Sequence, residues 1–111
     1  MSASGPDMKE MLEQAQRMQS RIAELQRELS TRRFEAASGG GMVTVVVSGQ
    51  LRVLEVRIEP SLFEESDRSM LEDLTAAAVN AALEKAQRTV QEELQQLQGQ
   101  LGAAAFSGPG R

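Results

Sequence analysis

The sequence predicts an α+β fold with a long N-terminal helix, a three-stranded antiparallel sheet and a long C-terminal helix. Apolar residues recur at helical spacing between Met8 and Leu29. The stretch Gly39–Pro60 is the one part of the chain with the β-branched content and alternation of strands. Met70–Val90 is strongly apolar and rich in alanine, the best helix former. The order of these stretches predicts the helix–sheet–helix arrangement.

The predicted N-terminal helix carries a narrow apolar stripe. The stripe consists of Met8, Met11, Ala15, Met18, Ile22, Leu25 and Leu29. The steps between these residues alternate between three and four, the heptad pattern of a helix that packs along a seam. The pattern extends over about three heptads, which is short for a coiled coil, so the helix packs either on another helix or on its own sheet. Asp7 and Glu10 have the spacing of a capping box at its start.

The central stretch predicts a β-hairpin with a third strand beside it. Met42–Val47 is almost wholly apolar and β-branched, as in a strand buried on both faces. Ser48 and Gly49 then predict a turn, with a glycine that can adopt positive φ. From Leu54 to Ile58 apolar and charged residues alternate, which predicts one buried and one solvated face. Because three glycines before the hairpin permit a sharp bend, Arg32–Ala37 is expected to pair as the third strand.

The second helix is expected to begin at about Asp67 or Ser69 and to end at Gly99 and Gly102. Glu72 lies three residues after Ser69, which is again capping-box spacing, and acidic residues suit a helix N-terminus. The acidic residues around this start therefore have a local explanation. They also lack the spacing and the glycine of a calcium loop, so no metal site is expected.

Three residues near this helix are given specific roles. Leu62 and Phe63 are expected to anchor the polar connection that precedes the helix. Asn80 is the one polar residue in the middle of the alanine-rich block. We expect Asn80 to act as a hydrogen-bonding register pin at an interface, because buried asparagines commonly have that role.

The composition favours one domain and self-association. With 111 residues, the chain has the size of a single domain, which we place at residues 8–98 between flexible tails at residues 1–7 and 99–111. Hydrophobic residues make up 41% of the chain but aromatic residues only 3%, so a monomer must build its core from aliphatic side chains and alanine. Burial of further apolar surface against a second copy is therefore favoured.

Several functional classes are disfavoured. The chain has no cysteine and no histidine, which removes disulfides, thiolate chemistry and the usual general base, and it has no phosphate-binding glycine motif. We therefore expect no enzyme, no cofactor and no small-molecule substrate. No stretch has the length and apolarity of a membrane span, and no signal-peptide pattern is present, so a cytoplasmic protein is expected. The net charge of −4 does not by itself suggest nucleic-acid binding.

The order of helix, glycine-rich bend, hairpin, acidic connection and alanine-rich helix resembles the YbaB/EbfC family of bacterial nucleoid-associated proteins. The resemblance extends over about residues 8–95. The segments that carry it are Gly40-Gly41-Met42-Val43, Val56-Arg57-Ile58-Glu59-Pro60, Met70-Leu71-Glu72-Asp73-Leu74 and Ala76-Ala77-Ala78-Val79-Asn80-Ala81-Ala82. The sequence departs from the family at Ser48, where the family often has asparagine, and at Ala81, where aspartate is common. The second departure argues against a required Asn-Asp pair.

The resemblance implies a homodimer whose central sheets pack together and whose long helices project. It also implies binding of duplex DNA with little sequence specificity, a nucleoid-associated location and a role in organising the nucleoid or modulating gene expression. Phosphate neutralisation is expected from Arg17, Arg21, Arg27, Arg32, Arg33, Lys85 and Arg88. Arg52 and Arg57 are weaker candidates, because Glu55 and Glu59 lie among them.

A second interpretation stays open at this point. The heptad stripe, the acidic balance and the glutamine-rich helix faces also fit a non-enzymatic structural or adaptor dimer that binds another protein through its helices. The arginines of the first helix also fit a solvated, ion-paired face, because Glu13 lies four residues before Arg17 and Glu24 three residues after Arg21.

Overall fold

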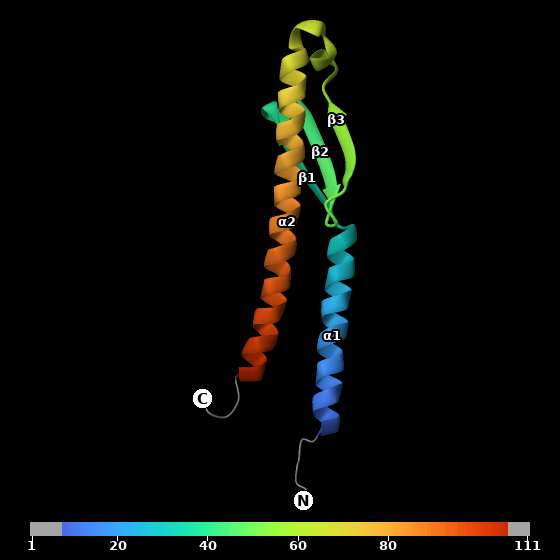
Figure 1. The fold of residues 1–111 in the computed structure, drawn as a ribbon, viewed down its shortest axis with the longest axis vertical. Helices are drawn as coiled ribbons and strands as arrows, with labels where there is room; N and C mark the ends of the chain where they lie inside the picture. The colour runs from blue at the N-terminus through green and yellow to red at the C-terminus, as the bar shows by residue number, and fades with distance from the viewer. Residues whose placement is uncertain (1–7, 107–111) are drawn as a thin grey trace, which may run out of the picture. The chain divides into compact units, whose positions relative to one another are not determined.

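The computed structural model describes the backbone of residues 8–106 and the side chains of residues 8–100 (Figure 1). The predicted α+β fold, with an N-terminal helix, a three-stranded antiparallel sheet and a long C-terminal helix, is confirmed. The elements are α1 Met8–Thr31, β1 Arg33–Ser38, η2 Gly39–Gly41, β2 Val43–Ser48, β3 Val53–Ile58, η3 Pro60–Phe63, η4 Glu65–Asp67 and α2 Arg68–Phe106.

The chain divides into two compact units, and each is described by itself. Leu29–Glu92 contains the sheet and the first part of α2, and the other unit contains the remaining turns of α1 and α2. The predicted tail at residues 1–7 and the end of the predicted C-terminal tail, residues 107–111, lie outside the described residues. The expectation of a single domain over residues 8–98 stays a prediction.

The sheet has β2 at its centre, paired antiparallel with β1 and with β3. Val45 lies opposite Ala36 on β1 and Val56 on β3, which sets the register. The predicted bend between β1 and β2 is formed by Gly39–Gly41, whose φ angles are 60°, 67° and 99°. This left-handed region costs other residues about 1–2 kcal/mol each, so the three glycines permit the reversal that brings β1 beside β2.

The β2–β3 hairpin turns differently from the prediction. The Leu51 N–H donates to the Ser48 carbonyl over 2.8 Å, and Leu51, not Gly49, adopts positive φ at 66°. Gly49 is needed for space instead, because a Cβ at this position would overlap the backbone oxygen of Leu29. A glycine in the sequence does not distinguish a need for positive φ from a close tertiary approach.

A β-bulge adds one residue to β3 near the turn. Val46 pairs with Glu55, whereas Val47 pairs with Val53, so Leu54 is an extra residue without its own partner on β2. The predicted alternation holds from Glu55 onwards. Bulges increase the local twist of a strand pair, so this end of β3 bends relative to β2.

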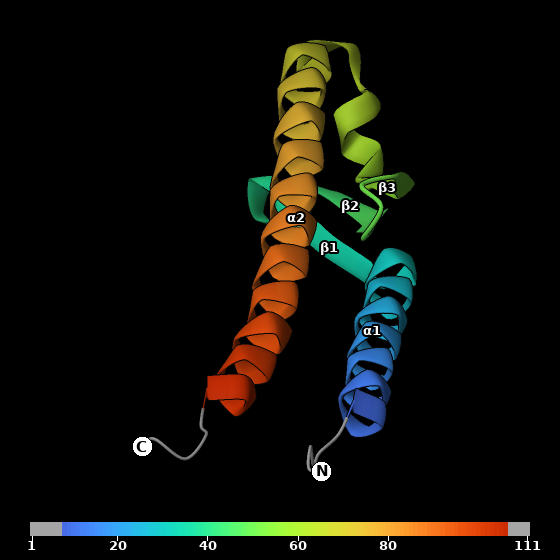
Figure 2. The ribbon, with the colours of Figure 1, turned by 60° about the horizontal axis from the view of Figure 1, so that its bottom comes forward.

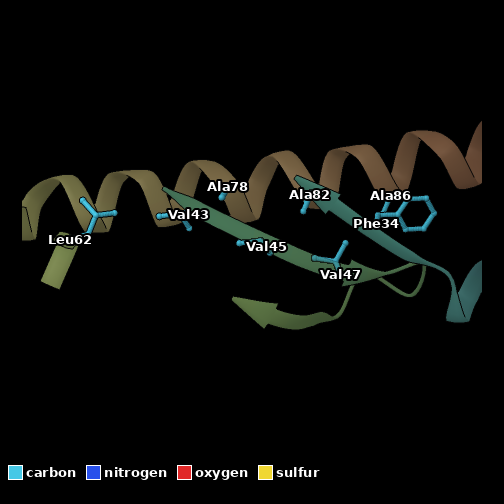
Figure 3. Close-up of a cluster of buried hydrophobic side chains, with 8 residues drawn as sticks. All are labelled: Phe34, Val43, Val45, Val47, Leu62, Ala78, Ala82 and Ala86. Carbon is cyan, nitrogen blue, oxygen red and sulfur yellow. The ribbon is translucent and has the colours of Figure 1, made fainter. Parts of the chain in front are cut away.

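The core of Leu29–Glu92 lies between α2 and the sheet. Ala78, Ala82 and Ala86 recur one helical turn apart, and all three are fully buried. They pack against a cluster of buried side chains, Phe34, Val43, Val45, Val47 and Leu62 (Figure 3). Figure 2 shows this part of α2 lying over β1 and β2, with β3 to one side. The short alanine side chains let the helix backbone approach the strands closely.

The predicted end of the second helix is wrong. α2 continues through Gly99 and Gly102 to Phe106. A helical glycine keeps its backbone hydrogen bonds and costs only about 1 kcal/mol relative to alanine, so two glycines among good helix formers do not terminate the helix. The space around Gly99 is open, and no close packing accounts for this glycine.

The anchoring role predicted for Phe63 is wrong, whereas the interface role predicted for Asn80 stays a prediction. Leu62 anchors the connection as expected and is fully buried, but its neighbour Phe63 is 66% exposed. Adjacent residues in a tight 3₁₀ turn point in different directions, so one anchor excludes the other. Asn80 is exposed on α2, because the side of the helix that faces the sheet is taken by Ala78 and Ala82.

Candidate nucleic-acid interface

Arg17 and Arg21 lie on one exposed face of α1. They are four residues apart, so their side chains are neighbours on the helix surface. With Glu13, Gln16 and Ser20 they line a shallow hollow. Among the residues that the structure describes, neither arginine forms a salt bridge, including the pair with Glu13 that the spacing permits. Both positive charges therefore face solvent and are accessible to a ligand.

Arg27 and Arg32, near the end of α1, are exposed but already interact within the chain. The Arg32 guanidinium lies over the ring of Phe34, 5.3 Å from its centroid. Such a cation–π contact is worth about 0.5–1 kcal/mol at an exposed site. Arg32 can therefore reach a phosphate only by leaving this contact or by sharing its charge with it.

Arg33 belongs to an ion-pair ladder on the sheet face opposite α2. Arg33 lies 3.1 Å from Glu55, and Arg57 lies 3.2 Å from Glu35 and 3.4 Å from Glu55. These side chains come from β1 and β3 and flank Val46 of β2, which is only 4% exposed. The ladder shields the apolar side chain of the central strand, and DNA binding by Arg33 would require Glu55 to be released.

Lys85 holds α2 to the outer strand of the sheet. Its Nζ donates a hydrogen bond of 3.0 Å to the backbone carbonyl oxygen of Glu35 on β1. The strand order makes β1 an edge strand, and this lysine occupies one carbonyl along that edge. Lys85 therefore has a structural partner that the charge pattern in the sequence does not reveal.

Arg88 has surroundings on α2 similar to those of Arg17 on α1. It is exposed and lines a shallow hollow with Glu84, Gln87 and Gln91. Within the described part of the chain it forms no salt bridge. Seven residues were predicted to bind DNA. Of these, Arg17, Arg21 and Arg88 are the ones whose charged groups form no salt bridge, cation–π contact or hydrogen bond with a described residue. Arg88 lies in the unit with the sheet, and the other two lie in the other unit.

The structure also reveals an uncovered apolar surface on β3, which we call the β3 surface. It consists of Val53, Leu54 and Val56, which are 47%, 48% and 42% exposed. Val56 lies opposite the fully buried Val45, so apolar side chains continue from the core onto a part of the sheet that α2 does not cover. The alternation in the sequence predicted a buried face here and gave no signal that this chain leaves it open.

Two further results concern other kinds of site. The described residues contain no cluster of three or more acidic, histidine or cysteine side chains that is arranged to hold a metal ion. At the start of α2, Arg68 pairs instead with Glu72 over 3.7 Å. None of the described helices combines the length and apolarity needed to cross a membrane.

Comparisons with known proteins identify the family. The model of the YbaB/EbfC DNA-binding family matches residues 4–101. A "Nucleoid-associated protein" of Pelotomaculum thermopropionicum is 40% identical over 87% of this chain and 92% of its own length. One from Legionella pneumophila is 46% identical over 78% of this chain and 77% of its own length.

An uncharacterized protein of Helicobacter pylori has a similar fold. Its crystal structure aligns with a TM-score of 0.55 and 22% identity, covering 78% of this chain and 96% of the other. At this identity the likeness supports the fold alone. The family model and the curated relatives cover most of the chain. It therefore belongs to the YbaB/EbfC DNA-binding family, and membership in this non-enzymatic family confirms the expectation that the chain is not an enzyme.

Proposed function

We propose that this protein is a nucleoid-associated homodimer that binds duplex DNA with little sequence specificity, and that it thereby organises the nucleoid or modulates gene expression. The observation that carries the proposal is the pair Arg17 and Arg21, which share one exposed face of α1 and have no salt bridge to a described residue. The family membership supports DNA as the ligand. The names of the relatives support the nucleoid.

The proposed contacts are made to phosphates, which explains low sequence specificity. Arginines that neutralise phosphates contribute affinity without reading base edges. Arg17, Arg21 and Arg88 are the main candidates, because their charges are accessible. Arg27 and Arg32 are secondary, and Arg33 and Lys85 contribute only where DNA outcompetes Glu55 and the Glu35 carbonyl. The exposed faces that carry Arg17 and Arg21 on α1 and Arg88 on α2 are thus each proposed to contact DNA.

The homodimer is supported by the β3 surface. Its three apolar side chains adjoin the core but are between 42% and 48% exposed in one chain. A second copy that covers this surface would complete the burial on the side of the sheet that α2 leaves open. Dimerisation would also bring together two sets of accessible arginines, which offsets the net charge of −4 per chain where the DNA is bound.

The salt dependence of DNA binding tests the proposal. A labelled random duplex is titrated with the protein at about 50 and 200 mM salt, and anisotropy is recorded. Three arginines from each of two copies would make six phosphate contacts, so the slope of log K against log salt would be about −5. Absence of binding at the lower salt concentration would contradict the proposal.

The alternative, an adaptor dimer that binds another protein through its helices, has one observation in its favour. Met8 and Met11 of the apolar stripe are 71% and 64% exposed, and the neighbouring Leu12 is 62% exposed, so the apolar side chains at the start of α1 have no cover within the described chain. A stoichiometric partner whose capture survives nuclease treatment, and is lost when Met11→Ser and Leu12→Ser are combined, would favour this alternative.

A further inference from the structure

The connection before α2 exposes an aromatic side chain. The whole chain has only three phenylalanines and neither tryptophan nor tyrosine. Phe34 lies in the core at 4% exposure, whereas Phe63 at the end of η3 is 66% exposed. Aromatic side chains bury the largest apolar areas and are enriched at the centres of protein interfaces. An exposed aromatic in so aromatic-poor a chain therefore marks a candidate contact surface.

Phe63 borders a hollow with an apolar floor. The hollow has a volume of about 310 Å³ and is formed by Leu62, Phe63 and Leu71 together with three charged residues, Glu64, Glu65 and Arg68. Leu62 is fully buried in the core and supports the hollow from beneath, so the accessible apolar lining is Phe63 and the partly exposed Leu71, which packs on that core. The volume is at the lower limit for a ligand site, which suits one large side chain rather than an extended ligand. We call this site the Phe63 hollow.

The surroundings of the Phe63 hollow are strongly acidic. The segment from Glu59 to Asp73 contains six carboxylates and one basic residue, Arg68, for a net charge of −5. The charge of Arg68 is partly offset by Glu72, 3.7 Å away. DNA phosphates are repelled by such a segment, whereas lysine and arginine side chains are attracted to it. The negative charge and the apolar lining of the hollow together favour a partner segment that carries basic side chains around one apolar side chain.

We propose that the Phe63 hollow binds a partner protein through a basic peptide segment with one large apolar side chain. The apolar side chain enters the hollow against Phe63 and the partly exposed Leu71, and flanking lysines or arginines pair with Glu64 and Glu65. The hollow shares no residue with Arg17, Arg21 and Arg88, which carry the DNA proposal. The inference therefore does not depend on DNA binding.

The test compares two labelled synthetic peptides by anisotropy. Both are nonapeptides with blocked ends and two lysines on each side of the centre, and the central residue is leucine in one and serine in the other. The leucine peptide is expected to bind about tenfold more tightly, because truncation of an anchor residue commonly has at least that effect. Phe63→Ser should remove the preference for leucine. Glu64→Gln with Glu65→Gln should weaken both peptides and reduce the dependence on salt.

Leu51→Ser is the matched control, because it removes an exposed apolar side chain, 43% exposed, from the turn between β2 and β3, which is assigned to no binding surface. It should leave peptide binding unchanged. Circular dichroism and DNA binding should be the same for Phe63→Ser and the parent. Equal affinity of the parent for the two peptides would overturn the proposal. So would dissociation of the protein to monomers on Phe63→Ser, because the hollow would then belong to an interface with a second copy.

Discussion

Replacement of Arg17 and Arg21 together by alanine should remove most of the salt dependence of DNA binding that α1 contributes. Both side chains are exposed on one face of the helix, and neither forms a salt bridge with a described residue. In a homodimer the double variant removes four charges. Each phosphate contact contributes about 0.9 to the slope of log K against log salt, so the slope should become shallower by about 3–4. Anisotropy titrations of one duplex at several salt concentrations measure this change.

Arg33→Ala combined with Arg57→Ala is the matched control for net charge. It also removes two positive charges per chain, but both side chains are paired with Glu35 or Glu55. Partly exposed pairs of this kind contribute about 0–1 kcal/mol each, so the control should remain folded and bind DNA with nearly the parental slope. If the two double variants lost the same amount of slope, net charge rather than the exposed face of α1 would govern binding, and the argument from accessible arginines would be refuted.

Three further predictions concern stability and assembly. Gly49→Ala should lower the free energy of unfolding in urea by about 3 kcal/mol, because the added Cβ would overlap the Leu29 backbone. Gly40→Asn should cost less than about 1 kcal/mol, because asparagine tolerates positive φ and no atom lies within 4 Å of a Cβ at this position. Equal effects of the two substitutions would contradict the steric explanation. Val56→Glu should weaken dimerisation by about 3 kcal/mol or more in sedimentation equilibrium, because it places an unpaired charge on the β3 surface; an unchanged dimer would exclude this interface. Ala82→Leu should lower the free energy of unfolding by about 1–3 kcal/mol, because it overpacks the fully buried contact between α2 and the sheet. Ala77→Leu, at an exposed position of the same helix, should leave it unchanged in the same assay. Similar losses for the two variants would argue against close packing at Ala82.

Much of the fold was predictable because its signals are local. The β-branched run at Val43–Val47 and the glycines at Gly39–Gly41 predicted the central strand and the bend that adds β1 to it. The alanine-rich stretch predicted the helix that covers the sheet, and alanines at successive turns are its buried residues. Periodicity and backbone freedom are properties of neighbouring residues, so they can be read without knowledge of distant contacts. The same residues carried the resemblance to the YbaB/EbfC family, which the comparisons confirm.

Local patterns thus specify the order and type of the elements and the family, and the composition lacks the residues for common catalytic chemistry. Tertiary structure decided which charges remain accessible. In the sequence, Arg33 and Lys85 cannot be distinguished from accessible basic residues such as Arg17 and Arg88. Their partners, Glu55 for Arg33 and the Glu35 carbonyl for Lys85, are 22 and 50 residues away along the chain. It also decided that Phe63 faces solvent while Leu62 is buried. A side chain's partners and exposure depend on strand register and helix docking, which bring distant residues together, and local patterns do not encode that geometry.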